Sequence, residues 1–247
     1  MTKVISIHSF RGGTGKSNIT ANIAAKLAQQ GHRVGVFDCD IQSPGIHVIF
    51  GLDTNTIVNT INDYLWGTCQ IQQAAYQVFT DAASGGSVHL VPSSIKANDI
   101  ARILRESYDA NAIHNAFREL IAALQLDYLL IDTHPGLNEE TLLSIAISDV
   151  LLIILRPDQQ DFQGTSVTVS VAQRLRVPDI KLIVNKIPPD YDVADVQRKV
   201  EEIYGCPIAA LLPLSLEVAQ NASSQLFALK APGHPFSEGI QQLVDQL

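Results

Sequence analysis

Aromatic residues and charged residues are both scarce in this chain of 247 residues. Aromatic side chains make up 6% of it and charged ones 17%, whereas 46% of the residues are hydrophobic. A chain with this balance buries a sizeable core, which excludes an intrinsically disordered protein. The shortage of aromatics means that the core is mainly aliphatic. The length suits one large α/β domain, so we expect residues 1–247 to form a single domain.

Positive charge, long apolar runs and cysteine motifs are lacking as well. The formal net charge is −8, which argues against a protein that coats nucleic acid through its overall charge but leaves a local basic patch open. No apolar run reaches about 18 residues and no leader pattern opens the chain, so neither a membrane span nor export is expected. The sparse cysteines Cys39, Cys69 and Cys206 follow no metal or redox spacing and favour reduced thiols in a cytoplasmic protein.

Apolar runs alternate along the chain with segments of helical periodicity. Strands are expected at Lys3–His8, Arg33–Phe37, Val88–Val91, Tyr128–Ile131, Val150–Leu155, Ile180–Asn185 and Ile208–Leu211. Helices are expected at Lys16–Gln30, Ala97–Leu104, Asp109–Leu124, Glu139–Ser148, Phe162–Leu175 and Val193–Tyr204. Most strand runs are continuously apolar, as in a sheet that is covered on both faces. The alternation predicts an α/β fold with a mostly parallel, twisted sheet of about seven or eight strands and helices on both faces.

Residues 53–105 give the weakest pattern. The aromatic segments Tyr64–Trp66 and Tyr76–Phe79 are expected to be buried, and Ser84–Ser87 is expected to form a turn, as in a hairpin.

A glycine-rich segment joins the first expected strand to the first expected helix. It runs Phe10-Arg11-Gly12-Gly13-Thr14-Gly15-Lys16-Ser17. The glycines let backbone N–H groups close around phosphate oxygens, and the helix N-terminus adds its positive dipole end. Lys16 would reach the terminal phosphates of a nucleotide, and the Ser17 hydroxyl would bind Mg²⁺. The usual spacing puts a glycine where this chain has Phe10, and here a double glycine preceded by Arg11 takes its place.

Carboxylates follow two other expected strands, at the sheet edge where parallel α/β folds bind ligands. Asp38 continues the second strand toward Lys16 or the Mg²⁺ waters, and Asp40 lies on the following loop, where it could hold an attacking water. Asp132 ends a strand of apolar residues, which suits a Mg²⁺ ligand that acts through water.

These segments together resemble the ParA/MinD superfamily of P-loop ATPases with a deviant Walker A motif. The resemblance runs from Met1 to about Pro235, and Arg11 stands where that family has its signature lysine. It implies ATP and Mg²⁺ as cofactors and an ATP-dependent homodimer in which the signature residue reaches the partner's phosphates. It assigns Asp40 to the attacking water, Asn185 to the adenine base and Pro213 to the wall beside it. The nucleotide-binding residues it implies are Gly12, Gly13, Thr14, Gly15, Lys16, Ser17 and Asn18.

Two residues depart from the family pattern near this site. His134 stands where the family usually has the first proline after its strand-end aspartate, and it is interpreted as a phosphate sensor, a pH-sensitive contact or a plain loop residue. Arg156 follows the strand Val150–Leu155. Either it and Arg11 both neutralise phosphate, one on its own nucleotide and the other across a dimer interface, or Arg156 pairs with a nearby carboxylate.

The surface on which such an ATPase would act stays open in the sequence. The last segment, Pro235–Leu247, has one apolar helical face but no Lys or Arg, so packing on its own domain is favoured over membrane binding. Cations that could bind DNA are Arg174, Arg176, Lys181, Arg198, Lys199 and Lys230. The leading interpretation is a positioning or partitioning ATPase with an unidentified stimulating or cargo protein.

Two alternatives remain beside it. One is a low-turnover nucleotide switch or scaffold for a motility or secretion apparatus. The other is a metabolic enzyme on the same fold, such as an amide ligase. An iron-protein subunit is disfavoured because the cysteines do not match cluster ligands.

Overall fold

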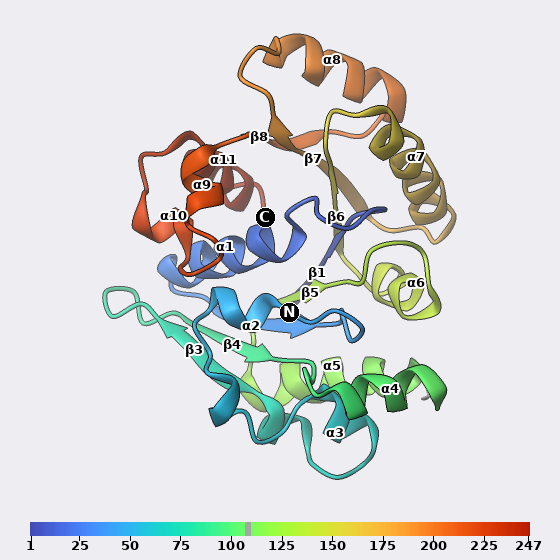
Figure 1. The fold of residues 1–247 in the computed structure, drawn as a ribbon, viewed down its shortest axis with the longest axis vertical. Coiled ribbons are helices and arrows are strands. Elements are labelled where there is room, and N and C mark those ends of the chain that lie inside the picture. The colour runs from blue at the N-terminus through green and yellow to red at the C-terminus, as the bar shows by residue number, and fades with distance from the viewer. Residues whose placement is uncertain (107–109) are drawn as a thin grey trace.

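One sheet runs through the part of the chain that the structure, a computed structural model, describes, namely residues 1–106 and 110–247. The sheet has eight strands in these residues, in the order β3-β4-β2-β5-β1-β6-β7-β8 (Figure 1). The strands are β1 Lys3–His8, β2 Arg33–Asp38, β3 Tyr76–Thr80, β4 Ser87–Val91, β5 Tyr128–Asp132, β6 Val150–Leu155, β7 Asp179–Ile187 and β8 Ile208–Pro213. All neighbours are parallel except β3 and β4. The predicted α/β fold is confirmed.

The helices connect these strands as the sequence pattern predicts. The longer ones are α1 Lys16–Gln29, α4 Ala97–Arg105, α5 Ala110–Leu124, α6 Glu139–Ala146, α7 Gln159–Arg174, α8 Val193–Tyr204 and α11 Pro235–Val244. The expected start of the third helix at Asp109 lies outside the described residues. The short helices are α2 Ile46–Ile49, α3 Ile61–Leu65, α9 Leu216–Gln220 and α10 Phe227–Lys230, with single 3-10 turns at Thr54–Thr56 and Ile71–Ala74.

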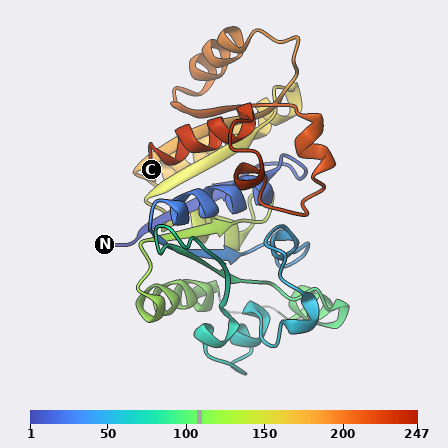
Figure 2. The same cartoon turned by 90° about the vertical axis from the view of Figure 1, so that its left-hand side faces the viewer.

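Hydrophobic cores cover both faces of the sheet, which explains why its strands are apolar at nearly every position. In Figure 1, α1 and α11 lie on one side of the sheet and α6 and α7 on the other, and Figure 2 looks onto the side of α1 and α11. Along β6, Leu152 and Ile154 face a core formed with α1 and α11, whereas Leu151 and Ile153 face a core formed with α7 and α8. On the face of the sheet opposite α1, strands β2 and β5 pack on α5. Successive strand residues point to opposite faces, so burial on both sides requires an uninterrupted apolar run.

The segment that the sequence left least defined forms the antiparallel end of the sheet. Strands β3 and β4 make the hairpin that the Ser84–Ser87 turn predicts. The expectation that Tyr64–Trp66 and Tyr76–Phe79 are buried is wrong in degree, because none of these side chains is fully buried. They lie at the edge of the fold, where Trp66 is stacked under the Arg102 guanidinium at 4.3 Å, so these aromatics cover the core only from one side.

The C-terminal helix α11 packs on the domain, as predicted. Its apolar residues Phe236, Ile240, Leu243 and Val244 are at most 3% exposed and join the core beside α1 and β8. Among the residues that the structure describes, no helix combines the length and the apolar character needed to cross a membrane.

Candidate nucleotide-binding site

The loop between β1 and α1 forms a cradle with free backbone donors. Gly13 and Gly15 have φ values of 77° and 96°, which lie in the left-handed region that favours glycine. Gly15 is the N-cap of α1, and no side chain caps this helix end and no acidic residue lies in its first turn. The first N–H groups of α1 therefore remain available to an anion, as phosphate binding requires.

Lys16 is held beneath this cradle by Asp132. Its Nζ lies 3.3 Å from Asp132 Oδ1, and the two side chains are 8% and 1% exposed. The Thr20 hydroxyl, one turn further along α1, donates to the Lys16 carbonyl at 3.0 Å and lies 3.3 Å from the same Asp132 oxygen. The sequence analysis missed Thr20, although its spacing of four residues from Lys16 places it on the same helix face.

Asp38 and Asp132 lie side by side in the sheet, directly behind the loop. They are paired in the parallel register of β2 and β5, and Asp38 is fully buried. Burial and the neighbouring Asp132 charge raise the pKa of Asp38 well above its ordinary value. Neither Oδ2 atom has a hydrogen-bond partner, so the pair has oxygen lone pairs to spare.

These carboxylates fit a hard divalent cation such as Mg²⁺, which prefers oxygen ligands. The described residues contain no cluster of three or more His, Cys, Asp or Glu that could enclose a metal. Asp132 and Ser17 are the residues best placed to hold it, because Ser17 lines the cavity and Asp132 contacts Lys16, which lines it too.

A cavity of about 410 Å³ opens above the glycine loop. It brings together most of the residues predicted for phosphate binding and hydrolysis. Its walls include Gly12, Gly13, Thr14, Gly15, Lys16, Ser17, Asn18, Asp40 and His134. Ser43, on the loop after Asp40, also lines it and was missed by the sequence analysis.

Asp40 and His134 meet at one wall of this cavity. His134 Nδ1 lies 2.7 Å from Asp40 Oδ1, and the two side chains are 24% and 13% exposed. The Ser43 backbone N–H donates to the same Asp40 oxygen at 3.1 Å. The residue assigned to water and the residue that departs from the family pattern are therefore directly bonded.

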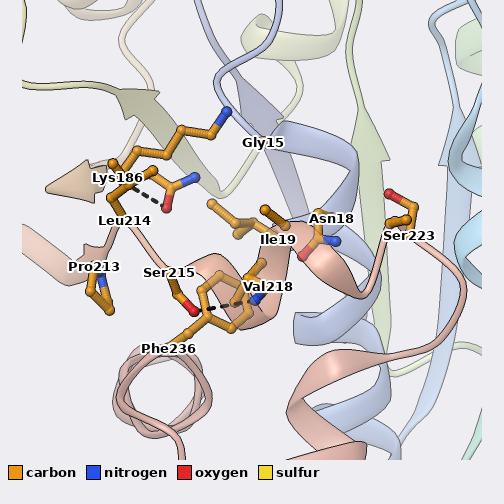
Figure 3. Close-up of a pocket in the computed structure, with 13 residues that line it drawn as sticks. Gly15, Asn18, Ile19, Lys186, Pro213, Leu214, Ser215, Val218, Ser223 and Phe236 are labelled. Carbon is orange, nitrogen blue, oxygen red and sulfur yellow. Dashed lines mark hydrogen bonds between the residues drawn. The ribbon is translucent and has the colours of Figure 1, made fainter. Parts of the chain in front are cut away.

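A second cavity of about 300 Å³ adjoins the first and is mostly apolar in its lining (Figure 3). Asn185 and Pro213 both line it, as predicted for a base site, together with Ser215, Val218 and Phe236. Asn185 Nδ2 donates to the Thr14 carbonyl at 2.7 Å, and its Oδ1 accepts the Lys186 backbone N–H at 2.9 Å. Asn185 thus joins the second cavity to the glycine loop.

Lys186 is a further cation of this region that the sequence analysis did not select. Its Nζ donates to the Gly13 carbonyl at 2.8 Å, and it lines the second cavity. Its position directly after Asn185, at the carboxyl end of β7, was the available signal.

Arg11 and Arg156 lie to one side of both cavities and converge on Asp161, near the start of α7. Arg156 binds this nearly buried carboxylate through Nε at 2.9 Å and Nη2 at 3.0 Å. Arg11 Nη1 is 3.6 Å from Asp161 and 3.9 Å from Asp158. Burial would raise the pKa of Asp161, but the hydrogen bonds from Arg156 outweigh it and lower that pKa. Arg156 has the carboxylate partner that one of its two interpretations predicts.

The three cysteines lie apart and are unbonded. Cys39 and Cys206 are buried, and Cys69 is half-buried and packs against the core that contains Cys39. Burial raises the pKa of the Cys206 thiol, which favours its protonated form.

The fold, the glycine loop and the strand-end aspartates define a P-loop nucleotide-binding protein. A family model described as an AAA domain (AAA_31) matches residues 2–182. The chain belongs to this family and, with its relatives, to the ParA/MinD superfamily of P-loop ATPases.

Two curated relatives match nearly the whole chain. An uncharacterized ATP-binding protein of Methanocaldococcus jannaschii is 27% identical over 248 residues, which cover 100% of this chain and 88% of the relative. The flagellum site-determining protein YlxH of Helicobacter pylori is 27% identical over 254 residues, with 100% and 82% covered. Among solved structures, septum site-determining protein MinD of Pyrococcus horikoshii, complexed with Mg-ADP, has a TM-score of 0.82 at 21% identity and covers 100% of this chain and 96% of its own. That likeness shows the shared fold.

Proposed function

We propose that this protein is a positioning or partitioning ATPase that binds ATP with Mg²⁺, forms a nucleotide-sandwich homodimer and hydrolyses ATP when a partner stimulates it. The observation that carries the proposal is the 410 Å³ cavity, in which the phosphate cradle, Lys16 and Asp40 face the same space. The names of the relatives support the process. One is a flagellum site-determining protein and others are septum site-determining proteins.

Binding would begin with the phosphates entering the cradle. The backbone N–H groups at the start of α1 and the Lys16 ammonium hold the negative charge. Lys16 leaves its contact with Asp132 to do so, which frees a carboxylate oxygen. Ser17 and Asp132 would hold Mg²⁺, which supplies charge neutralisation on the phosphate oxygens. The adenine base enters the second cavity, where Asn185 offers both a donor and an acceptor.

Hydrolysis would depend on Asp40. This carboxylate lines the cavity at its rim and orients a water for attack on the terminal phosphate. Asp38 takes no direct part in this scheme, because burial and the neighbouring Asp132 charge raise its pKa well above the ordinary value and so favour its uncharged form.

Arg11 is the better candidate for the contact with the partner's phosphates. It is 40% exposed on its side chain, and its two carboxylate contacts are longer than hydrogen bonds. Arg156 is bound bidentately to Asp161 and would have to break short hydrogen bonds first. Arginine forks to two oxygens where the family lysine supplies a point charge, so the exchange would alter the hydrolysis rate.

The surface on which the dimer acts is proposed to be non-specific DNA or a protein rather than a membrane. The packed helix α11 offers no basic amphipathic face. DNA binding would have to use a thin set of cations, because Lys181, Arg198 and Lys199 are each paired with carboxylates. Retention on DNA that weakens with added salt would support it, and absent or salt-independent binding would exclude it.

The experiment that tests the proposed activity is phosphate release from ATP and Mg²⁺ by the purified chain, with Lys16→Ala and Asp40→Ala as variants. We expect slow turnover in the wild type, no nucleotide binding in Lys16→Ala, and ATP binding without turnover in Asp40→Ala. A low-turnover switch or scaffold would bind ATP equally well, but its slow phosphate release would not rise when the stimulating partner is added. We propose that this ATPase cycle takes place in the cytoplasm.

A further inference from the structure

One side-chain hydrogen bond joins the two loops that follow β2 and β5. Asp40 comes from the first loop and His134 from the second, and their bond spans 2.7 Å at the wall of the phosphate cavity. The residues are 94 positions apart in the chain. The bond therefore fixes the position of one loop relative to the other at the place where hydrolysis is proposed to occur.

The direction of this bond follows from its chemistry. An ionised carboxylate only accepts hydrogen bonds, so the Nδ1 atom of His134 carries the proton and donates. The Ser43 N–H donates to the same oxygen, Oδ1, at 3.1 Å. Among the described residues, both contacts fall on Oδ1, and the lone pairs of Asp40 Oδ2 remain available to a water in the cavity.

The two donors to Asp40 do not restrain it equally. Ser43 lies on the same loop and moves with Asp40, so its bond shapes the loop without placing it. His134 is anchored elsewhere, because its carbonyl accepts the Thr141 hydroxyl of α6 at 3.3 Å. The preceding residue, Thr133, donates to the Ile7 carbonyl of β1 at 3.0 Å. Through His134 the carboxylate is tied to the rigid centre of the sheet.

We infer that His134 is a positioning residue for ATP hydrolysis, which holds Oδ1 of Asp40 so that Oδ2 accepts the hydrogen bond of the attacking water. The inference rests on the proposed ATPase function and assigns a role to the residue that departs from the family pattern. A proline at this position has no side-chain donor, so this way of placing the carboxylate belongs to this chain. A small misplacement of such a group costs up to about a hundredfold in rate.

The test compares His134→Ala with His134→Asn, whose side-chain amide keeps a donor near the Nδ1 position. His32→Ala is the matched control, because His32 also faces an aspartate, Asp127, at 4.0 Å, but at the start of β2 on the opposite edge of the sheet. Each variant is measured for kcat, for ATP affinity, and for affinity to ADP with aluminium fluoride, which mimics the transition state and reports without turnover.

We expect His134→Ala to lower kcat by about tenfold to a hundredfold and to weaken ADP–aluminium fluoride binding, with ATP affinity unchanged. His134→Asn should restore most of both losses, and His32→Ala should match the wild type. In an Asp40→Ala background, which is expected to have no turnover, His134→Ala should cause no further loss of ADP–aluminium fluoride affinity, since it acts through that carboxylate.

Three results would overturn the inference. The first is a His134→Ala variant with the kcat and the analogue affinity of the wild type. The second is a His134→Ala variant that loses ATP affinity as much as kcat. The third is a His134→Ala change that lowers analogue affinity further in the Asp40→Ala background. Each of these presumes that the wild type binds ATP and the transition-state analogue. A wild type that binds neither would instead remove the proposed ATPase function and the inference with it.

Discussion

The buried side chain of His8, just before the phosphate loop, should make the stability of the protein depend on pH. This residue ends β1 and is fully buried. Its Nδ1 lies 2.8 Å from Thr133 Oγ1, and that hydroxyl already donates to Ile7, so Nδ1 is the donor. Burial, helped by the positive charge of Lys16, lowers the pKa of His8 to about 3. The folded protein therefore keeps His8 neutral where an unfolded chain would protonate it.

We expect acid to destabilise the protein in part through His8. Below pH 6.5 the unfolded chain takes up a proton at this residue, whereas the folded state does so only near pH 3, so the free energy of unfolding falls across that window. His8→Asn keeps a donor to Thr133 and cannot titrate. Urea titrations at and below pH 6.5 should show a smaller acid loss in this variant. Equal acid sensitivity of the two proteins would contradict this account of His8.

Two glycines in the phosphate loop, Gly12 and Gly15, should contribute differently to stability and to nucleotide binding. A Cβ added at Gly15 would lie 2.6 Å from Asn185 Nδ2, at a φ of 96° that other residues rarely adopt. A Cβ at Gly12 would meet nothing within 4 Å, yet Gly12 lines the phosphate cavity. The same substitution should thus have different consequences three residues apart.

We predict that Gly15→Ala lowers the melting temperature and weakens nucleotide binding, because it strains the loop and displaces Asn185. Gly12→Ala should leave the melting temperature unchanged and weaken only nucleotide binding. Thermal unfolding with a parallel ATP titration checks both. Unchanged thermal stability in Gly15→Ala, or a large loss of it in Gly12→Ala, would show that the two positions are not distinguished as the structure implies.

Helix α7 packs closely against the phosphate loop at Gly164. A Cβ at this position would lie 2.1 Å from the Phe10 ring, so the ring packs where only glycine leaves room. Phe10 is followed directly by Arg11, whose guanidinium faces Asp161 on the same helix. The helix therefore sets the position of the residue proposed to cross the dimer.

We expect Gly164→Ala to destabilise the protein although alanine usually favours a helix interior by about 1 kcal/mol over glycine. The added methyl group should displace Phe10 and weaken ATP-dependent dimerisation. Phe10→Ala combined with Gly164→Ala should recover stability, since the clash is removed. Chemical denaturation of the two single variants and the double variant measures this coupling, and purely additive losses would refute it.

Much of the arrangement of helices and strands can be predicted from the sequence. The strands Lys3–His8 and Val150–Leu155 were predicted to the residue because two-sided burial imposes an unbroken apolar run. The pairing of Lys16 with Asp132 was not, since it joins residues 116 positions apart and depends on which strands are neighbours. Arg156 with Asp161 is a local pair, five residues apart at a helix start, and a nearby carboxylate partner was one of the two interpretations that the sequence left open.

For the whole molecule, the parallel sheet explains why the site was predictable in outline. Carboxyl ends of parallel strands share one edge, so the loops after β1, β2, β5 and β7 had to meet there. The base cavity was harder to foresee, because α9 and α11 close it from the last part of the chain by long-range packing. The bond between Asp40 and His134 likewise needed the order β2-β5-β1 to be known.

At the same scale, the central claim is that ATP closes two copies of the chain into a dimer through Arg11. The most direct test is the molecular mass of Asp40→Ala in solution, measured by light scattering after size exclusion with ATP and Mg²⁺ present. We predict a dimer with ATP, a monomer with ADP, and a monomer with ATP once Arg11→Ala is added, while Arg156→Gln leaves the dimer intact. A variant that binds ATP and stays monomeric, or a dimer that survives Arg11→Ala, would contradict the account.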